Sequence, residues 1–318
     1  MQNFRRKALA VFLAVLTVLF SFPLSVLALD AYPASDALSG AANSLEQTTG
    51  IQTEPYELTD RREECVKHFR QSDGSILAVD YGIPVHTRDD TGNWQDVDNT
   101  LAERGELYTT PDAKIKFSKK ITGNGNLFTL HDGNRKITLS LNGAKKKTAA
   151  TVIASEAAAE SDALLKLISL PKMTSRIVYA NILENVDLEY IVGAGRIKEN
   201  LIVKAPEDTY TYSFTLHLNH LEAVQNADSE IVIRDVQTKE TLYCIPAGYM
   251  YDAAGVYTNA VSYTLEEKGN GTYTFTVQPD RSWMEADERV FPVTIDPPLY
   301  LESGQGILNL NPTAPNAT

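Results

Sequence analysis

Residues 210–218 read Tyr210-Thr211-Tyr212-Ser213-Phe214-Thr215-Leu216-His217-Leu218. Large apolar or aromatic side chains take every second position, and smaller or polar side chains take the positions between them. Because successive side chains of a strand point to opposite faces of its sheet, this alternation predicts a strand with one buried and one wet face. Burying that face contributes about 8–15 kcal/mol before the entropy of ordering the chain is subtracted.

The same alternation recurs in residues 272–277, directly after the pair Asn270-Gly271. Asn-Gly and Asp-Gly pairs accept the positive φ angles that tight hairpins require, and four more occur at Asp73-Gly74, Asn124-Gly125, Asp132-Gly133 and Asn142-Gly143. No stretch shows the alternation of strands with long helices that is typical of parallel sheets. We therefore predict an all-β fold of antiparallel, sandwich-like sheets in two packed subdomains, with one short helical insertion within residues 148–170.

The first 28 residues have the layout of a secretory signal. Three basic residues are followed by an apolar run, a proline and small residues at the −3 and −1 positions: Arg5, Arg6, Lys7, Ala8 to Phe22, Pro23, Val26 and Ala28. This layout predicts cleavage after Ala28 and a secreted or cell-surface protein that meets the membrane only through its signal peptide, before cleavage. The alternative is an uncleaved anchor, because the apolar stretch is nearly long enough to span a bilayer.

The rest of the chain divides by composition. Residues 29–61 are rich in small and polar side chains and predict a flexible linker. The expected β subdomains are residues 62–170 and 171–298, and residues 299–318 are expected to be a disordered tail. In the first subdomain, residues 81–86 predict an edge strand because of Pro84, and the turn residues from Asp89 to Asn93 predict a hairpin.

Charge and cysteine content limit the function classes. The chain of 318 residues has 29 Lys+Arg and 41 Asp+Glu, which gives a net charge of −12. A surface of that sign repels phosphate backbones, so we expect no nucleic-acid partner. The two cysteines, Cys65 and Cys244, are too few for a disulfide framework, so the fold must depend on its apolar core. The sequence does not decide whether these two residues pair.

Metal sites find little support in the sequence. The chain has five histidines but neither an HExxH nor a CxxC motif, so we expect no zinc site; the histidines are His68, His86, His131, His217 and His220. Oxygen-bearing side chains gather between Asp89 and Asn99 and are of the type that calcium prefers; they are Asp89, Asp90, Asn93, Asp96, Asp98 and Asn99. Their spacing is not that of an EF-hand loop and turn chemistry also explains them, so calcium stays an open alternative.

The sequence also gives little support for a catalytic site. Paired carboxylates could hydrolyse glycosides, and Glu184, Asp187, Glu189 and Glu199 are possible members. With 41 acidic residues in the chain, however, neighbouring carboxylates are expected by chance. No Gly-x-Ser-x-Gly motif is present, and neither cysteine lies in a nucleophile signature. Trp94 and Trp283 could stack on sugars, although tryptophan more often packs in a core. We therefore name no catalytic, cofactor-binding or metal-binding residue and expect no cofactor.

Several blocks, taken in their order and spacing, resemble a known family. They are Val85-His86 leading to residues 94–101 (WQDVDNTL), residues 184–190 (ENVDLEY) leading to 197–203 (IKENLIV), residues 245–250 (IPAGYM) and residues 289–297 (RVFPVTIDP). Together they resemble the N-terminal β-rich region of large secreted Gram-positive proteins with DNRLRE domains and Rhs repeats, the WapA-like wall-associated proteins. In that family the region precedes further β domains, a repeat shell and sometimes a toxin. Since the present sequence contains no repeat shell or toxin segment, nuclease activity is not carried over.

These observations together predict a secreted or cell-surface, non-enzymatic scaffold or adhesion module, with a cell-wall or extracellular protein or glycan as its partner. The alternative is a carbohydrate-binding module or glycoside hydrolase that acts on extracellular glycans.

Overall fold

The computed structural model describes residues 54–89, 91–123, 125–153, 163–296 and 299–301. Two compact units divide the chain. Unit 1 comprises residues 1–96 and 159–169, and unit 2 comprises residues 97–158 and 170–318. The predicted signal peptide, most of the predicted linker and most of the predicted tail lie outside the described residues.

Unit 1 is built on short strands. A three-stranded antiparallel sheet has the order β1-β2-β3, and β4 pairs with β5 in a separate hairpin. Its elements are β1 (Tyr56–Glu57), the 3-10 helix η1 (Thr59–Arg61), β2 (Val66–Arg70), β3 (Ile76–Asp80), β4 (His86–Arg88), β5 (Trp94–Asp96) and α3 (Ala163–Ile168). Among its described residues, the fully buried apolar side chains are Phe69, Val79 and Val85.

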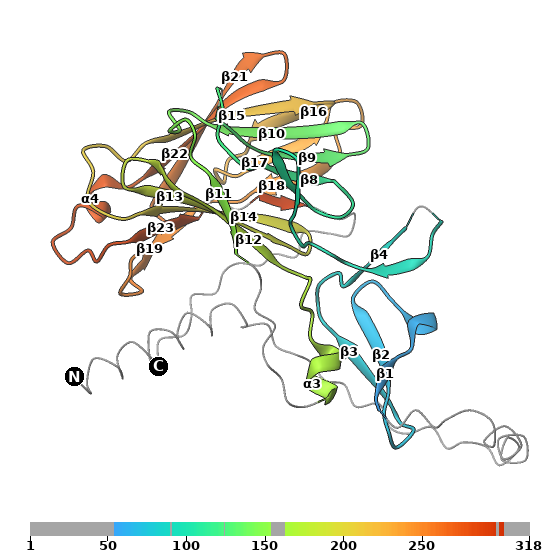
Figure 1. The fold of residues 1–318 in the computed structure, drawn as a ribbon. Coiled ribbons are helices and arrows are strands. Elements are labelled where there is room, and N and C mark those ends of the chain that lie inside the picture. The colour runs from blue at the N-terminus through green and yellow to red at the C-terminus, as the bar shows by residue number, and fades with distance from the viewer. Residues whose placement is uncertain (1–53, 90, 124, 154–162, 297–298, 302–318) are drawn as a thin grey trace, which may run out of the picture. The chain divides into compact units, whose positions relative to one another are not determined.

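The first sheet of unit 2 has eight strands in the order β21-β22-β15-β10-β9-β8-β7-β6 (Figure 1). These strands are β6 (Ala102–Arg104), β7 (Leu107–Thr109), β8 (Ile115–Ser118), β9 (Asn126–Asp132), β10 (Arg135–Leu141), β15 (Tyr212–Asn219), β21 (Val261–Gly269) and β22 (Thr272–Pro279). Strand β15 carries residues 212–218 of the alternating stretch. Tyr212, Phe214, Leu216 and Leu218 are buried, as predicted.

The second sheet of unit 2 has eleven strands. Eight follow the order β11-β12-β13-β14-β24-β18-β17-β16, while β23 joins β14 to β19 and β20 pairs with β19. They are β11 (Ala150–Ile153), β12 (Ser175–Leu183), β13 (Val186–Gly193), β14 (Arg196–Val203), β16 (Leu221–Gln225), β17 (Ile231–Asp235), β18 (Thr241–Ile245), β19 (Tyr249–Tyr251), β20 (Tyr257–Thr258), β23 (Val293–Asp296) and β24 (Leu299–Leu301). A single helical turn, α4 (Arg281–Met284), follows β22 and begins at the Asp280 N-cap.

The two sheets of unit 2 share one apolar core. Phe117 and Phe128 of the first sheet lie 5.3 and 5.4 Å from the ring of Tyr190 in the second sheet, measured between ring centroids. Aromatic pairs at such separations add to the free energy of burial. The prediction of an all-β fold of antiparallel sheets is confirmed, because the described residues contain only short helices beside these strands.

Glycine turns close two of the hairpins that the sequence predicts, whereas at Asn142-Gly143 the strands β10 and β11 on either side do not pair with each other. Gly133 (φ 60°) joins β9 to β10, and Asn270 and Gly271 (φ 53° and 67°) join β21 to β22. A side chain at position 271 would collide with the backbone carbonyl oxygen of Leu218, so this position needs glycine for space as well as for its backbone angle.

Some local expectations differ from the structure. Residues 81–85 form a loop, and the strand begins at His86. Within the predicted linker, β1 and η1 are ordered, because β1 pairs with β2 and its Glu57 accepts hydrogen bonds from Arg62. At the other end, β24 pairs with β14 and β18 within the predicted tail. The expected subdomain boundary at residue 170 stays a prediction, although strands from both sides of it pair, as β10 does with β15.

Searching the described residues found no helix of sufficient length and apolar content to cross a membrane. Cys65 and Cys244 are both half-buried and form no disulfide among the described residues.

Candidate functional site

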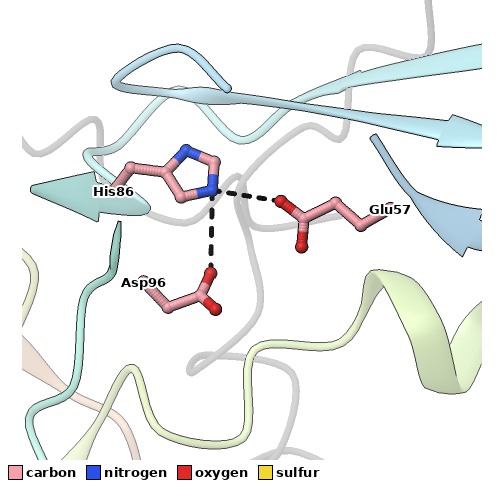
Figure 2. A group of neighbouring side chains, drawn as sticks. All are labelled: Glu57, His86 and Asp96. Carbon is pink, nitrogen blue, oxygen red and sulfur yellow. Dashed lines mark ion pairs between the residues drawn. The ribbon is translucent and has the colours of Figure 1, made fainter. Parts of the chain in front are cut away.

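In unit 1, a ring nitrogen of one histidine lies close to the carboxylates of two other residues. His86 Nε2 lies 3.4 Å from Glu57 Oε1 and 3.6 Å from Asp96 Oδ1 (Figure 2). All three ligand atoms lie within 4.8 Å of one another. The His86 side chain has no exposed surface, whereas the Asp96 side chain is 49% exposed. One side of the group is therefore sealed, and the other is open to solvent.

The backbone explains how these residues meet. His86 and Asp96 face each other across the β4–β5 hairpin, as partners in its register. The turn between the two strands is held by Asp89, whose Oδ1 accepts hydrogen bonds from the backbone of Thr91 and Asn93. Glu57 comes from β1, where it is paired with Phe69 of β2. The group therefore joins the hairpin to the three-stranded sheet.

A backbone hydrogen bond determines which nitrogen of His86 is available. His86 Nδ1 lies 2.6 Å from the carbonyl oxygen of Glu63. A carbonyl oxygen can only accept, so Nδ1 carries the proton and donates it. Nε2 is buried and has no hydrogen-bond partner in the structure, since its separations from the carboxylates exceed hydrogen-bond length. A buried polar atom of this kind is rare in native proteins.

Two cations balance the carboxylates. Arg62 donates to both oxygens of Glu57, at 2.7 and 3.1 Å, and to Asp96 Oδ2 at 3.2 Å. Lys67 Nζ donates to Asp96 Oδ1 and lies 3.7 Å from Glu57 Oε2. Burial by itself would raise the pKa of each carboxyl, but the Arg62 hydrogen bond to Glu57, the Lys67 hydrogen bond to Asp96 and both positive charges outweigh it. Both pKa values lie below the usual range, so both groups are charged at neutral pH.

The described residues of the calcium alternative make separate contacts in the structure. Asp89 is occupied by its own turn, Asp96 faces Arg62 and Lys67, and Asp98 accepts hydrogen bonds from Thr100. Asn99 donates to the carbonyl oxygen of Met173, and Asp90 is outside the described residues.

The other histidines have separate environments. His68 Nδ1 lies 2.9 Å from the carbonyl oxygen of Arg61, and His217 Nδ1 lies 3.0 Å from Thr272 Oγ1. His131 is on β9 and His220 follows β15. Among the described residues, His86 is the histidine whose ring nitrogen lies within 4.8 Å of two carboxylate oxygens that could bind a metal ion with it.

The four carboxylates considered for hydrolysis are dispersed. Glu184 pairs with Lys145, Asp187 pairs with Lys204, and Glu189 pairs with Arg176. Glu199 instead points into the core and lines a cavity of about 20 Å³ with apolar neighbours such as Phe128 and Ile197. That volume holds one water molecule, so this cavity has no room for a sugar ring.

Each tryptophan has an arginine over one face. The Arg88 guanidinium lies 3.9 Å from the Trp94 ring centroid, and the Arg289 guanidinium lies 3.5 Å from that of Trp283. Arg289 also forms a buried ion pair with Asp252, at 2.8 Å. These contacts favour a packing role for both indoles, because a sugar would have to stack on the remaining face.

Sequence reasoning missed the group of Glu57, His86 and Asp96. Glu57 fell within the predicted linker, and His86 was taken as the end of an edge strand. The available signal was the spacing of the turn residues, because a two-stranded hairpin about Asp89 to Asn93 places His86 opposite Asp96. No local pattern pointed to Glu57.

Comparison with known proteins finds similar proteins that carry the name WapA. The chain is 27% identical over 98% of its length to "tRNA nuclease WapA" of Bacillus subtilis (strain 168), and the match covers 14% of that protein. It is 28% identical over 81% of its length to "tRNA(Glu)-specific nuclease WapA" of Bacillus subtilis subsp. natto, covering 11% of it, and equally so to "tRNA3(Ser)-specific nuclease WapA" of Bacillus spizizenii. No protein-family model and no solved structure matches the chain.

These names correct two expectations. The expectation that the protein is not an enzyme is contradicted, because the relatives are named as nucleases. It depended on finding no reactive constellation in a stretch that corresponds to 14% of a relative's length, and so it could not address the activity of the longer proteins. The expectation of no nucleic-acid partner also conflicts with the names, because the net charge of one region says nothing of sites elsewhere. Over 81–98% of its length, the chain is similar to one region of proteins named WapA.

Proposed function

We propose that this chain is the cell-surface β region of a WapA-like nuclease and that it serves there as a rigid mount for the parts that act on tRNA. The observation that carries the proposal is the extent of the similarity, which takes in 98% of this chain but 14% of the relative. Nearly all of this chain therefore corresponds to one region of the relative, and the rest of the relative is much longer.

The architecture of unit 2 supports a mounting role. Its two sheets share one continuous core of buried side chains, and such cores are packed as densely as organic crystals and resist deformation. A rigid sandwich can hold a neighbouring domain at a fixed place.

An extracellular location forms part of the proposal. The basic, apolar and small-residue pattern of residues 1–28 supports export, although those residues lie outside the described part of the chain. Cell-wall or extracellular protein or glycan partners are consistent with that location. The glycan-binding alternative has less support, because Arg88 and Arg289 each cover a face of the two tryptophans.

The proposal is tested by expressing the full chain in Bacillus subtilis and measuring its amounts in the cytoplasm, the cell wall and the medium. We expect the protein in the wall and medium fractions. A variant in which Arg6 and Lys7 are both changed to Glu should remain inside the cell. Retention of the unchanged protein in the cytoplasm would refute the proposal.

A second arm addresses the mount itself. The matching region of the Bacillus subtilis relative is replaced by this chain, and tRNA cleavage is measured on recipient cells and on purified protein. We expect the chimera to cleave tRNA in both assays. Replacing Phe214 by Asp, which breaks the core, should abolish delivery to cells. Equal delivery by the two chimeras would show that the sandwich is not a mount.

A further inference from the structure

We propose that Glu57, His86 and Asp96 form a binding site for a divalent metal ion of the zinc class, which fastens the β4–β5 hairpin to the three-stranded sheet of unit 1. The proposal is independent of the nuclease relationship. It concerns three residues from three strands, none of which the sequence or the similar proteins assign to a site.

The first observation is geometric. Zinc binds histidine nitrogen at about 2.0–2.1 Å and carboxylate oxygen at about 2.0–2.2 Å, so ligand atoms at the corners of its tetrahedron lie about 3.3–3.6 Å apart. His86 Nε2 lies 3.4 Å from Glu57 Oε1 and 3.6 Å from Asp96 Oδ1. These separations are too long for hydrogen bonds but match neighbouring corners of a zinc tetrahedron. The half-exposed side chain of Asp96 leaves access for a water molecule as the fourth ligand.

The second observation concerns the histidine. A metal-binding histidine almost always donates its other ring proton to a backbone carbonyl or a carboxylate, which fixes the ring and leaves a lone pair for the metal. His86 does this through Nδ1 and the carbonyl oxygen of Glu63, at 2.6 Å. Its Nε2 is buried, aimed at two carboxylates and without a hydrogen-bond partner. A nitrogen lone pair that faces two anionic oxygens is unfavourable unless a cation, a proton or a metal ion, lies between them.

The third observation is that the described part of unit 1 has a small apolar core. In the described part of unit 1, the fully buried apolar side chains are Phe69, Val79 and Val85. Small folds with so little apolar burial commonly gain stability from a metal ion or a disulfide. A metal ion at this point would link β1 to both strands of the hairpin.

The positive charges of Lys67 and Arg62 oppose the binding of a further cation at this site. Lys67 Nζ donates to Asp96 Oδ1, one of the proposed ligand atoms, so its ammonium group stands in for a cation in this structure. Zinc and this buried ammonium group would compete for the negative charge of the same carboxylate. Arg62 can remain, because a carboxylate oxygen has two lone pairs and can accept its hydrogen bond while binding a metal. The affinity for zinc should therefore be limited by the positive charge of Lys67.

The test uses the full chain without a histidine tag, stripped with a chelator and titrated with zinc chloride in a calorimeter. We expect saturable binding of one zinc ion and a rise in the unfolding temperature. Calcium chloride should give neither, because Ca²⁺ prefers six to eight oxygen ligands. Cobalt(II), titrated in place of zinc, should give the visible absorption of a tetrahedral nitrogen and oxygen site.

Three variants separate this site from adventitious binding. His86→Gln should weaken zinc binding by about tenfold or more, as loss of ligands or their supports does in other sites. His68→Gln, on β2 of the same unit, is the matched control and should bind like the unchanged protein. Lys67→Met should bind zinc several-fold more tightly, because it removes the competing charge.

The following results would refute the proposed zinc site. Absence of saturable zinc binding to the unchanged protein, or equal binding by His86→Gln, would refute the site. Should His86→Gln fail to fold, the Lys67→Met arm decides, because zinc affinity that is unchanged or weaker in that variant contradicts the proposal.

Discussion

Glu199 places a carboxyl group between the two sheets of unit 2. It lies on the inward face of β14, in line with the buried Ile197, Leu201 and Val203. Burial raises its pKa to about 8, and the nearby Asp296 adds to the shift. The group is therefore protonated at neutral pH and has no need of a buried counter-charge.

This pKa makes the stability of unit 2 depend on pH. Between the usual value of 4.5 and about 8, the folded state holds a proton that the unfolded state has lost. The free energy of unfolding should therefore fall as pH rises through this window, by on the order of several kcal/mol in total. Glu199→Gln cannot titrate and should remove most of this decline. The measurement is urea unfolding of both proteins at pH 5, 7 and 9, and equal slopes against pH would contradict the assignment.

Replacing Phe214 measures how much the buried face of β15 contributes to the free energy of unfolding. Its ring is fully buried and stacks with Phe275, 5.9 Å away between centroids. Phe214→Ala should lower the free energy of unfolding by about 3–5 kcal/mol, since it leaves a cavity in a packed core. His217→Ala lies on the exposed face of the same strand and should change stability by no more than about 0.5 kcal/mol. Chemical denaturation monitored by circular dichroism compares them, and similar losses would mean that the strand is not buried on one side.

At the scale of elements, the hairpin between β21 and β22 depends on one glycine. Gly271 and Gly255 both have positive φ angles, of 67° and 83°, but a side chain meets a backbone oxygen only at position 271. Replacing Gly255 by Ala should cost about 1 kcal/mol of backbone strain. Gly271→Ala adds a steric clash and should cost clearly more. Thermal unfolding of the two variants measures the difference, and equal losses would show that the clash is relieved without cost.

The elements also show what sequence could and could not predict. Alternation found β15 and β22, and the pairs Asp132-Gly133 and Asn270-Gly271 found the β9–β10 and β21–β22 hairpins, because both signals are local. Burial of Glu199 was not predicted, since its position in the alternation favours the interior whereas its charge favours the surface, and only packing decides between them. The group of Glu57, His86 and Asp96 was missed for another reason. Glu57 reaches it through the pairing of β1 with β2, which no nearby residue encodes.

At the scale of the whole chain, the two units differ in the size of their cores. Unit 1 has a few buried apolar side chains in its described part, and unit 2 has one extended core shared by both sheets. Stability follows the buried apolar area, so the two units should open at different free energies.

Hydrogen exchange under increasing denaturant measures this difference. Amides of β2 and β3 should lose protection at lower denaturant concentration than amides of β13 and β15. Phe214→Ala should lower the protection of unit 2 and leave that of unit 1 unchanged. A single, simultaneous loss of protection in both units would contradict their independence.

The strand order of unit 2 has a consequence for the export that we propose for this chain, in which the polypeptide would cross a membrane one end first. Val203 of β14 pairs with Val293 of β23, and Ile137 of β10 pairs with Leu218 of β15. Neither sheet can be completed until the late strands have emerged from the translocation channel, because early strands lack their neighbours until then. Half-emerged chains expose unpaired apolar strands, and such species aggregate readily. Extracytoplasmic chaperones should therefore be needed during secretion more than after it.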